Sequence, residues 1–348
     1  MAKTKVPEPR QLPSGAWHIQ MQVNGETLYI TRPTREETIS EALAIKSGLK
    51  AASNTPGREK TVTHAIDSYI ESRQNVLSPA TIRGYRIIQR HRFQGVMHTK
   101  IGTISPQRWQ AVVNAEARQC GAKTLKNAWG FMASVIHEAT GQTVEAKLPQ
   151  VIPNERPFLD RDEIRIFLRE LRGDNVEIAA LLALSSLRRS EIMALDWADV
   201  DLEKGLIYVR GAVVQDEHNK MVRKRETKNV SSRRTVPIIA PLREALGEVS
   251  NKSGPVATTS LTRMYENINK ICRRCGLPEV GVHGLRHSFA SLSYDLRMPE
   301  KATMQIGGWS DPGTMRKIYT HISAKRAENY KSDFTAFFES LDENLDKK

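Results

Sequence analysis

Two stretches of turn-forming residues divide this chain of 348 residues into three segments. Residues 51–60 read AASNTPGREK, and residues 147–157 read KLPQVIPNERP, with three prolines. Such clusters interrupt helices and strands, because proline lacks an N–H donor and glycine readily adopts turn conformations. We therefore predict three domains, over residues 1–55, 60–146 and 155–348, instead of one continuous core.

The excess of basic over acidic residues indicates which kind of molecule the protein binds. Lysine and arginine together number 52 and exceed the 39 acidic residues by 13, which gives a pI of about 9.7 and favours nucleic acid as partner. Hydrophobic residues at 39% and charged residues at 26% exclude a wholly disordered chain and a membrane-embedded one. No apolar run is long enough to span a membrane and none follows the charged N-terminus, so we predict a cytoplasmic protein. Three cysteines are too few for a disulfide framework.

The first segment has the pattern of a small sheet followed by a helix. Residues 17–23 (WHIQMQV) and 26–31 (ETLYIT) are strand-like, and the Asn-Gly pair between them is a strong hairpin signal. Thr34 and Glu37 then have the spacing of a helix capping box. We expect an independent module of sheet and helix.

The second segment has the apolar periodicity of a bundle of four helices. It is also the most basic part of the chain, because residues 57–150 carry 13 basic and 6 acidic side chains. Arg83, Arg86 and Arg90 fall on one face of the second helix, where a row of cations can follow DNA phosphates. The residues that mark the four helices are Val62, Ile66, Tyr69 and Ile70; Ser78 and Pro79; Ser105 and Pro106; Leu125, Trp129, Met132 and Ile136.

The third segment mixes helices with strands. A capping pair, Asp160 and Glu163, opens an amphipathic helix, and residues 176–186 (VEIAALLALSS) form a second. Residues 205–214 and 234–239 are strand-like and flank a basic stretch, so we predict a β-hairpin within a mainly helical domain. The chain as a whole is therefore predicted to be multidomain and mainly α, with small β-sheets.

Several short strings in the third segment occur in an informative order: SSLRRSE at 185–191, Thr-Lys-Asn at 227–229, an H-x-x-R string, a tryptophan and finally Tyr-Thr-His. Together they resemble the catalytic domain of the tyrosine recombinases, the family of phage and mobile-element integrases, over roughly residues 155–325. The middle segment resembles that family's helical core-binding domain. The first resembles its arm-binding domain, which implies a three-stranded sheet. The residues that the strings single out are Arg188, Glu191, Lys228, His283, Arg286, Trp309 and Tyr319.

The resemblance implies a chemistry that these residue types suit. Tyr319 is the nucleophile and forms a 3′-phosphotyrosine, while Arg188 and Arg286 stabilise the charge on the phosphate. Lys228 acts as general acid toward the leaving 5′ oxygen, and His283 exchanges a proton with the phenol or hydrogen-bonds the phosphate.

Two further residues support this chemistry by the same resemblance. Glu191 orients the region around Arg188, and Trp309 supplies packing and an indole N–H. Ser186 stands where a glycine is common in the family, which affects only local backbone freedom. No cofactor, metal or nucleotide is required.

The implied activity is site-specific integration or excision of a phage or mobile element, by strand cleavage and rejoining through a Holliday junction. The implied assembly is a homotetramer on double-stranded DNA with core-type and arm-type sites, served by accessory DNA-bending and directionality proteins. A helical stripe in the tail (Phe334, Phe337, Phe338, Leu341 and Leu345) is expected to dock on a neighbouring protomer. The DNA-binding candidates are Arg83, Arg86, Arg90, Lys123, Lys126, Arg223, Lys224, Arg225, Arg233 and Arg234.

Other interpretations of the sequence remain open. A type IB topoisomerase has similar chemistry but relaxes any supercoiled DNA, and a sequence-specific DNA-binding protein without catalysis would bind and form no covalent product. Cys272 and Cys275, followed by His283 and His287, also mimic a zinc pattern. The second gap, between Cys275 and His283, is short for a zinc finger, and zinc would remove His283 from the phosphate.

Overall fold

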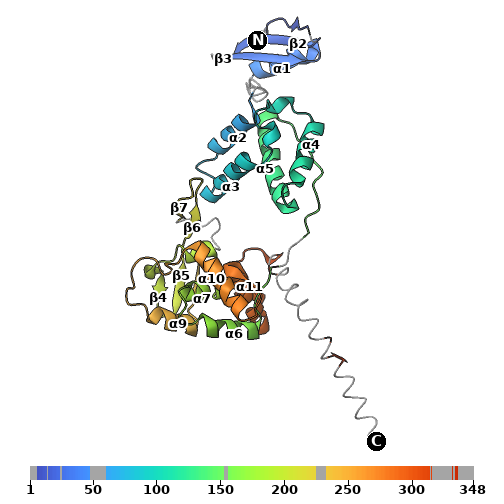
Figure 1. The fold of residues 1–348 in the computed structure, drawn as a ribbon. Coiled ribbons are helices and arrows are strands. Elements are labelled where there is room, and N and C mark those ends of the chain that lie inside the picture. Colours follow the sequence, from blue (N-terminus) through green and yellow to red (C-terminus); the bar gives the residue numbers. More distant parts are fainter. Residues whose placement is uncertain are drawn as a thin grey trace. The chain divides into compact units, whose positions relative to one another are not determined.

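The protein divides into two compact units, residues 1–152 and 153–348, each of which is described here by itself (Figure 1). Within the first unit, the sheet-and-helix module and the helical bundle have separate hydrophobic cores. The computed structural model describes residues 6–13, 15–23, 26–47, 60–152, 156–224, 233–313, 315, 331 and 334–335.

The N-terminal module is a three-stranded antiparallel sheet covered by one helix (Figure 1). The strands are β1 (Arg10–Gln11), β2 (Trp17–Val23) and β3 (Glu26–Arg32), in that order across the sheet. Helix α1 (Arg35–Lys46) begins at Thr34, whose side chain accepts a hydrogen bond from the Glu37 amide. The predicted strands and helix are thus confirmed, while the Asn-Gly pair lies outside the described residues.

The register of this sheet explains the module's small core. Ile19 lies opposite Ile30 and Met21 opposite Leu28, so the period of two places all four on one face. All four are buried, and Ala42 and Ile45 of α1 pack against them. The core is small, as a module of this length allows.

The helical bundle contains α2 (Val62–Glu71), α3 (Pro79–His91), α4 (Pro106–Ala117) and α5 (Ala122–Thr140). Serine or threonine caps the first three, and proline follows the cap of α3 and of α4, as the sequence predicts. Helix α5 packs against each of the others. The predicted apolar stripe on α5 is buried, and it contains Leu125, Trp129, Met132 and Ile136.

The second unit is built around one helix that is apolar on all sides. Helix α7 (Glu177–Leu184) is buried from Ala179 to its end and packs against α9 (Ala240–Gly247), α10 (Leu261–Arg274) and α11 (Gly281–Asp295). Helix α6 (Arg161–Leu171) opens on the predicted capping box, with both of its hydrogen bonds formed.

The strands of this unit differ from the predicted single hairpin. The sheet β4 (Val200–Asp201), β5 (Leu206–Val209) and β8 (Arg234–Pro237) is antiparallel, and β5 pairs directly with β8. A separate hairpin pairs β6 (Ala212–Gln215) with β7 (Met221–Lys224).

The predicted strand over residues 205–214 is therefore two strands that part at Gly211, and the basic stretch itself begins with a strand. The two strands have different partners, since β5 pairs with β8 and β6 pairs with β7. Glycine suits the junction, because a side chain at Gly211 would place its Cβ 3.0 Å from the Lys224 carbonyl oxygen.

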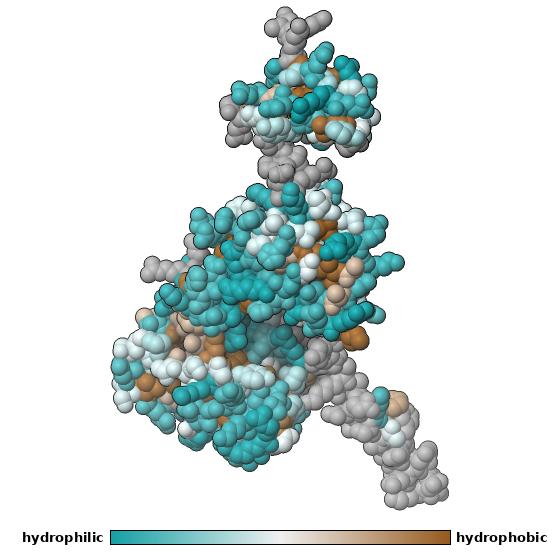
Figure 2. All heavy atoms as spheres, turned by 45° about the horizontal axis from the view of Figure 1, so that its top comes forward, coloured by the Kyte–Doolittle hydropathy of each residue, from teal (hydrophilic) through white to brown (hydrophobic). Residues whose placement is uncertain are grey.

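Hydrophobic side chains on the face shown in Figure 2 lie among a larger hydrophilic surface. In the described part of the chain, none of the helices has the length and apolarity needed to cross a bilayer. In the tail stripe, Phe334 is exposed, and the other positions lie outside the described residues.

Candidate active site

The turn between α7 and α8 (Arg189–Ile192) positions the first predicted catalytic arginine. Ser186 in this turn has φ of 82°, a left-handed conformation that favours glycine, so the family difference affects local backbone as expected. Arg188 follows as the N-cap of α8, and its side chain remains about one-third exposed.

Glu191 is the buried carboxylate around which this turn is organised. It is 3% exposed and accepts hydrogen bonds from the Arg188 amide at 2.8 Å and the Arg188 guanidinium at 2.6 Å. Arg234 adds two more, at 2.9 and 3.1 Å. Burial by itself raises the pKa of this carboxyl, but the hydrogen bonds and charge of Arg234 and Arg188 outweigh it and hold the pKa below 4.5.

Arg286 is buried, with only 2% of its surface exposed. Its guanidinium donates to the Ser186 carbonyl and, at 2.5 Å, to the Gly307 carbonyl. Burial, followed by the charges of Arg188 and Arg234, lowers its pKa to about 9, so it is still charged at neutral pH. We call Arg188, Arg234 and Arg286, with Glu191, the buried arginine cluster.

Trp309 forms a platform beneath this cluster. The Arg286 guanidinium carbon lies 4.3 Å from the centre of the indole ring, and Phe289 stacks on it with ring centres 6.2 Å apart. The preceding turn needs glycine, because a Cβ at Gly307 would overlap the Trp309 ring and Gly308 has φ of 63°. This turn ends α12 (Glu300–Gly307), and the Gly308 carbonyl accepts from Arg188.

His283 lies on the first turn of α11, at a cavity of about 620 Å³ that Arg156, Arg188 and Arg189 also line. We call this the His283 cavity. His283 is exposed, but desolvation by the surrounding protein, followed by the positive charges of Arg156, Arg286, Arg188 and Arg189, lowers its pKa to about 4. The imidazole is therefore neutral at pH 7, and its ring meets that of His287 edge to face at 4.8 Å.

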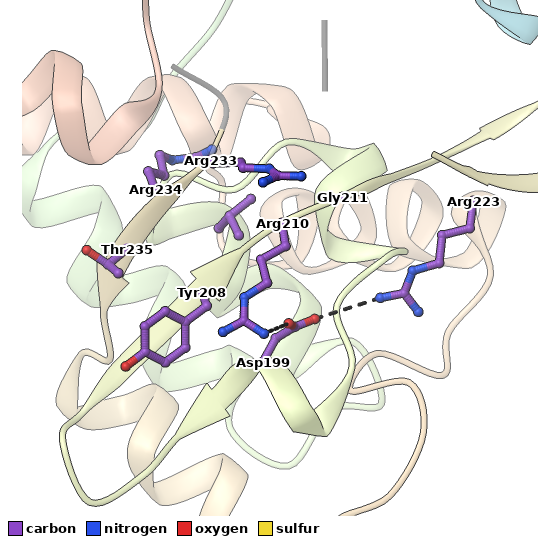
Figure 3. A pocket seen from close by; sticks show the side chains of 9 residues that line it. Asp199, Tyr208, Arg210, Gly211, Arg223, Arg233, Arg234 and Thr235 are labelled. Carbon is purple, nitrogen blue, oxygen red and sulfur yellow. Dashed lines mark ion pairs between the residues drawn. The ribbon is translucent and has the colours of Figure 1, made fainter. Parts of the chain in front are cut away.

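A second cationic cavity, of about 710 Å³, lies beside β5 and β8 (Figure 3). Asp199 pairs there with Arg210 at 3.3 Å and with Arg223 at 3.8 Å, the two arginines reaching it from different sides. Arg233 also lines the cavity and is exposed. We call it the hairpin pocket.

The structure thus brings together Arg188, Glu191, Arg286 and Trp309, and places His283 in the cavity that Arg188 lines. Lys228 and Tyr319 lie outside the described residues, so their predicted roles stay predictions.

The predicted DNA-binding residues fall into different environments. Lys123, Lys126 and Arg90 are exposed on the bundle. Arg86, in contrast, is turned toward α2, where it pairs with Asp67 and bonds Gln89. The remaining candidates are Arg83 and Lys224, which are partly exposed, Arg223 and Arg233 in the hairpin pocket, and Arg225, which lies outside the described residues.

Arg234 corrects an expectation, because it is not a surface cation. Its side chain is 3% exposed and belongs to the buried arginine cluster. The signal that could have found this is the alternation of β8, in which Arg234 is in phase with the buried Val236. Arg156 and Arg189, which no sequence motif predicts as site residues, also line the His283 cavity.

The zinc pattern does not form a ligand cluster. Cys272 is buried in the core of the second unit, and burial raises the pKa of its thiol. Among the described residues, which include all four of the pattern, no group of three or more histidine, cysteine or acidic residues is arranged to hold a metal ion.

Residues 157–326 match the phage integrase family. The chain belongs to this family of tyrosine recombinases. A tyrosine recombinase XerC-like protein of Caldanaerobacter subterraneus subsp. tengcongensis is 23% identical, over 85% of this chain and 88% of the relative.

Solved structures share the fold of this tyrosine recombinase. The Tn1549 transposon integrase in complex with transposon right end DNA has a TM-score of 0.61 at 18% identity, covering 78% of this chain and 99% of the integrase. A lambda integrase tetramer bound to a Holliday junction has a TM-score of 0.51 at 15% identity, covering 89% and 97%. As a tyrosine recombinase, the protein catalyses site-specific DNA cleavage and rejoining. The topoisomerase alternative is not favoured.

Proposed function

We propose that this tyrosine recombinase is an integrase that inserts or excises a phage or mobile element through a 3′-phosphotyrosine and a Holliday junction. In this proposal Arg188 and Arg286 stabilise the charge that develops on the scissile phosphate. Tyr319 attacks the phosphorus, and Lys228 protonates the departing 5′ oxygen. The roles of Tyr319 and Lys228 rest on the order of the motifs.

The observation that carries the proposal is that two arginines from motifs distant in sequence donate hydrogen bonds to neighbouring main-chain carbonyls. Arg286 spans the Ser186 and Gly307 carbonyls, and Arg188 reaches the adjacent Gly308 carbonyl. A guanidinium has five N–H donors in a rigid fork, so each arginine has further donors to offer a phosphate oxygen.

The state of His283 supports a neutral hydrogen-bonding role. Its pKa of about 4 is set partly by surrounding arginines, so few molecules carry a proton on it at pH 7. A bound phosphate offsets those positive charges and raises the pKa, because an opposite charge nearby favours the protonated form. His283 therefore becomes a better proton acceptor for the phenol when DNA is in place.

The DNA contacts outside the catalytic centre are assigned by domain. We assign core-type DNA to residues 60–146, where Lys123, Lys126 and Arg90 are exposed, and arm-type DNA to residues 1–55. The lambda integrase tetramer bound to a Holliday junction supports a homotetramer on DNA for this chain. In the same proposal the assembly joins two sites, and the tail docks on a neighbouring protomer. Accessory DNA-bending and directionality proteins complete this proposal.

The test is to trap the protein on nicked suicide DNA that carries its attachment site and to map the linked residue. We expect a covalent adduct at Tyr319 that disappears in Tyr319→Phe. The adduct should persist in the matched control Tyr330→Phe, which changes the next tyrosine in the sequence. Arg188→Lys and Arg286→Lys are expected to slow adduct formation by roughly 10²–10³-fold, the cost of removing a donor to developing charge. An adduct elsewhere, or none on a verified site, contradicts the proposal.

A further inference from the structure

One arginine of the buried cluster has no role in the proposed chemistry. Arg234 is the first residue of β8, which follows the segment that carries Lys228. Burying a guanidinium to 3% exposure is costly unless its donors are matched by acceptors.

Every nitrogen of the Arg234 guanidinium has an acceptor. Nε donates to the Ile306 carbonyl at 2.7 Å, and Nη1 donates to Glu191 at 3.1 Å. Nη2 donates to Glu191 at 2.9 Å and to the Ser186 carbonyl at 3.3 Å. One side chain thus joins β8, the turn before α8, α8 itself and the end of α12.

Each of these acceptors is shared with, or adjacent to, one used by a proposed catalytic arginine. Glu191 also accepts from Arg188, and the Ser186 carbonyl also accepts from Arg286. The Ile306 carbonyl directly precedes the Gly307 and Gly308 carbonyls, which accept from Arg286 and Arg188. Arg234 therefore contacts the same group of acceptors that orients the guanidinium groups of both proposed catalytic arginines.

The neighbouring arginine shows that this placement is specific to one position. Both Arg233 and Arg234 line the hairpin pocket (Figure 3), but Arg233 is exposed whereas Arg234 is buried. The bidentate contact with Glu191 needs the planar fork of arginine, which a lysine ammonium cannot reproduce.

We propose that Arg234 is a positioning residue, which fixes Glu191 and the Ser186 and Ile306 carbonyls so that Arg188 and Arg286 present their guanidinium groups to the scissile phosphate. The inference rests on the proposed catalytic roles of those two arginines.

The test compares Arg234→Met and Arg234→Lys with the unaltered full-length chain. Three quantities are measured: the single-turnover rate of adduct formation on suicide DNA at saturating protein, the dissociation constant for uncleaved site DNA, and the midpoint of thermal unfolding. We expect Arg234→Met to lower the rate about 10²-fold, the effect of a misplacement of about 1 Å in a catalytic group, with little change in DNA affinity.

Arg234→Lys separates positioning from stability. It keeps a positive charge beside Glu191, so its unfolding midpoint is expected to return toward that of the unaltered protein while the cleavage rate stays low. If Arg234→Met does not fold, Arg234→Lys carries the test. Arg165→Met is the matched control, because Arg165 is 63% exposed and pairs with Asp162 on its own helix. All three quantities should stay unchanged in this variant.

The possible outcomes are distinct. A folded Arg234→Lys that cleaves at the unaltered rate overturns the inference. So does a loss of DNA affinity with an unchanged rate at saturation, because that pattern identifies a phosphate ligand. If the unaltered protein forms no adduct on a verified site, the proposed function fails and the inference fails with it. A lowered rate in Arg234→Lys beside a normal unaltered protein supports positioning.

Discussion

The buried arginine cluster and the hairpin pocket both gather arginines around one carboxylate, yet their physics differs. In the cluster, Glu191 and Arg234 are each 3% exposed and share two hydrogen bonds of 2.9 and 3.1 Å. In the pocket, Arg210 and Arg223 are 59% and 51% exposed and reach Asp199 at 3.3 and 3.8 Å. Desolvated, well-aligned pairs fix geometry, whereas exposed, loose pairs leave cations available to a partner.

This difference teaches that a count of positive charge mixes two kinds of arginine. The cluster uses its charge internally, against Glu191 and main-chain carbonyls. The pocket holds its charge where it can meet a polyanion, and salt can screen it. Substitution of Glu191 and of Asp199, together with the titration of His283, tests that distinction.

The largest effect is expected from Glu191→Gln. Removing the charge leaves Arg234 buried without its ionic partner, and breaking a buried pair in this way costs about 3–5 kcal/mol of unfolding free energy. Chemical denaturation measures this cost. The control Glu244→Gln breaks an exposed pair with Arg172 and should cost at most about 1 kcal/mol. Equal costs would contradict the contrast drawn above.

The same carboxylate gives the unaltered protein an acid sensitivity of known sign. The folded-state pKa of Glu191 lies below its ordinary value of 4.5. Its contribution to stability is therefore present above pH 4.5 and is lost as the pH falls through the folded-state pKa. Glu191→Gln should lack this part of the acid dependence.

An intermediate effect is expected from the pH dependence of DNA binding at the His283 cavity. The pKa of His283 is about 4 in the free protein and rises when a phosphate binds, so binding takes up a proton. Affinity should therefore increase as the pH falls from 7.5 toward 5, by up to about tenfold for each unit of pKa rise. Fluorescence anisotropy at fixed ionic strength measures this.

His283→Gln is the variant that isolates this effect, because it keeps a hydrogen-bonding side chain and cannot titrate. Its affinity should gain less as the pH falls than that of the unaltered protein. Identical pH profiles in the two proteins would show that His283 does not sense the bound phosphate.

The smallest effect is expected from Asp199→Asn in the hairpin pocket. Asparagine keeps an acceptor oxygen while removing the charge that competes with DNA for Arg210 and Arg223. Affinity for DNA should rise at low salt by the worth of an exposed ion pair, about 0.2–1 kcal/mol or roughly 1.4–5-fold, and the gain should fade as salt increases.

Asp162→Asn makes the same change in net charge on α6, outside the pocket. An equal rise in affinity for both variants would mean that net charge, and not the pocket, determines the gain.

Local signals in the sequence predicted the helices well. The Asp160 and Glu163 capping box, and the serine-proline starts of α3 and α4, act within one turn and need no distant partner. The break at Gly211 could not be predicted in this way, because it depends on which strands pair with β5 and β6, namely β8 and β7.

The candidate site shows the same division between local and distant causes. The strings around Arg188 and Arg286 identify both residues, but they do not reveal that one carbonyl, that of Ser186, serves Arg286 and Arg234 together. The basic residues around Arg234 in sequence predict a DNA-binding residue, but its side chain is 3% exposed. Its burial follows from strand alternation and from Glu191, forty-three positions away.

The acceptors that hold the arginines have a consequence for any mutational survey of this enzyme. Most of them are main-chain oxygens, at Ser186, Ile306, Gly307 and Gly308, and no exchange of side chains deletes a carbonyl. A saturation mutagenesis scan would therefore detect the arginine donors and miss the carbonyl oxygens that accept their hydrogen bonds. Sensitivity at those four positions would report only the path of the backbone, such as the left-handed turns at Ser186 and Gly308.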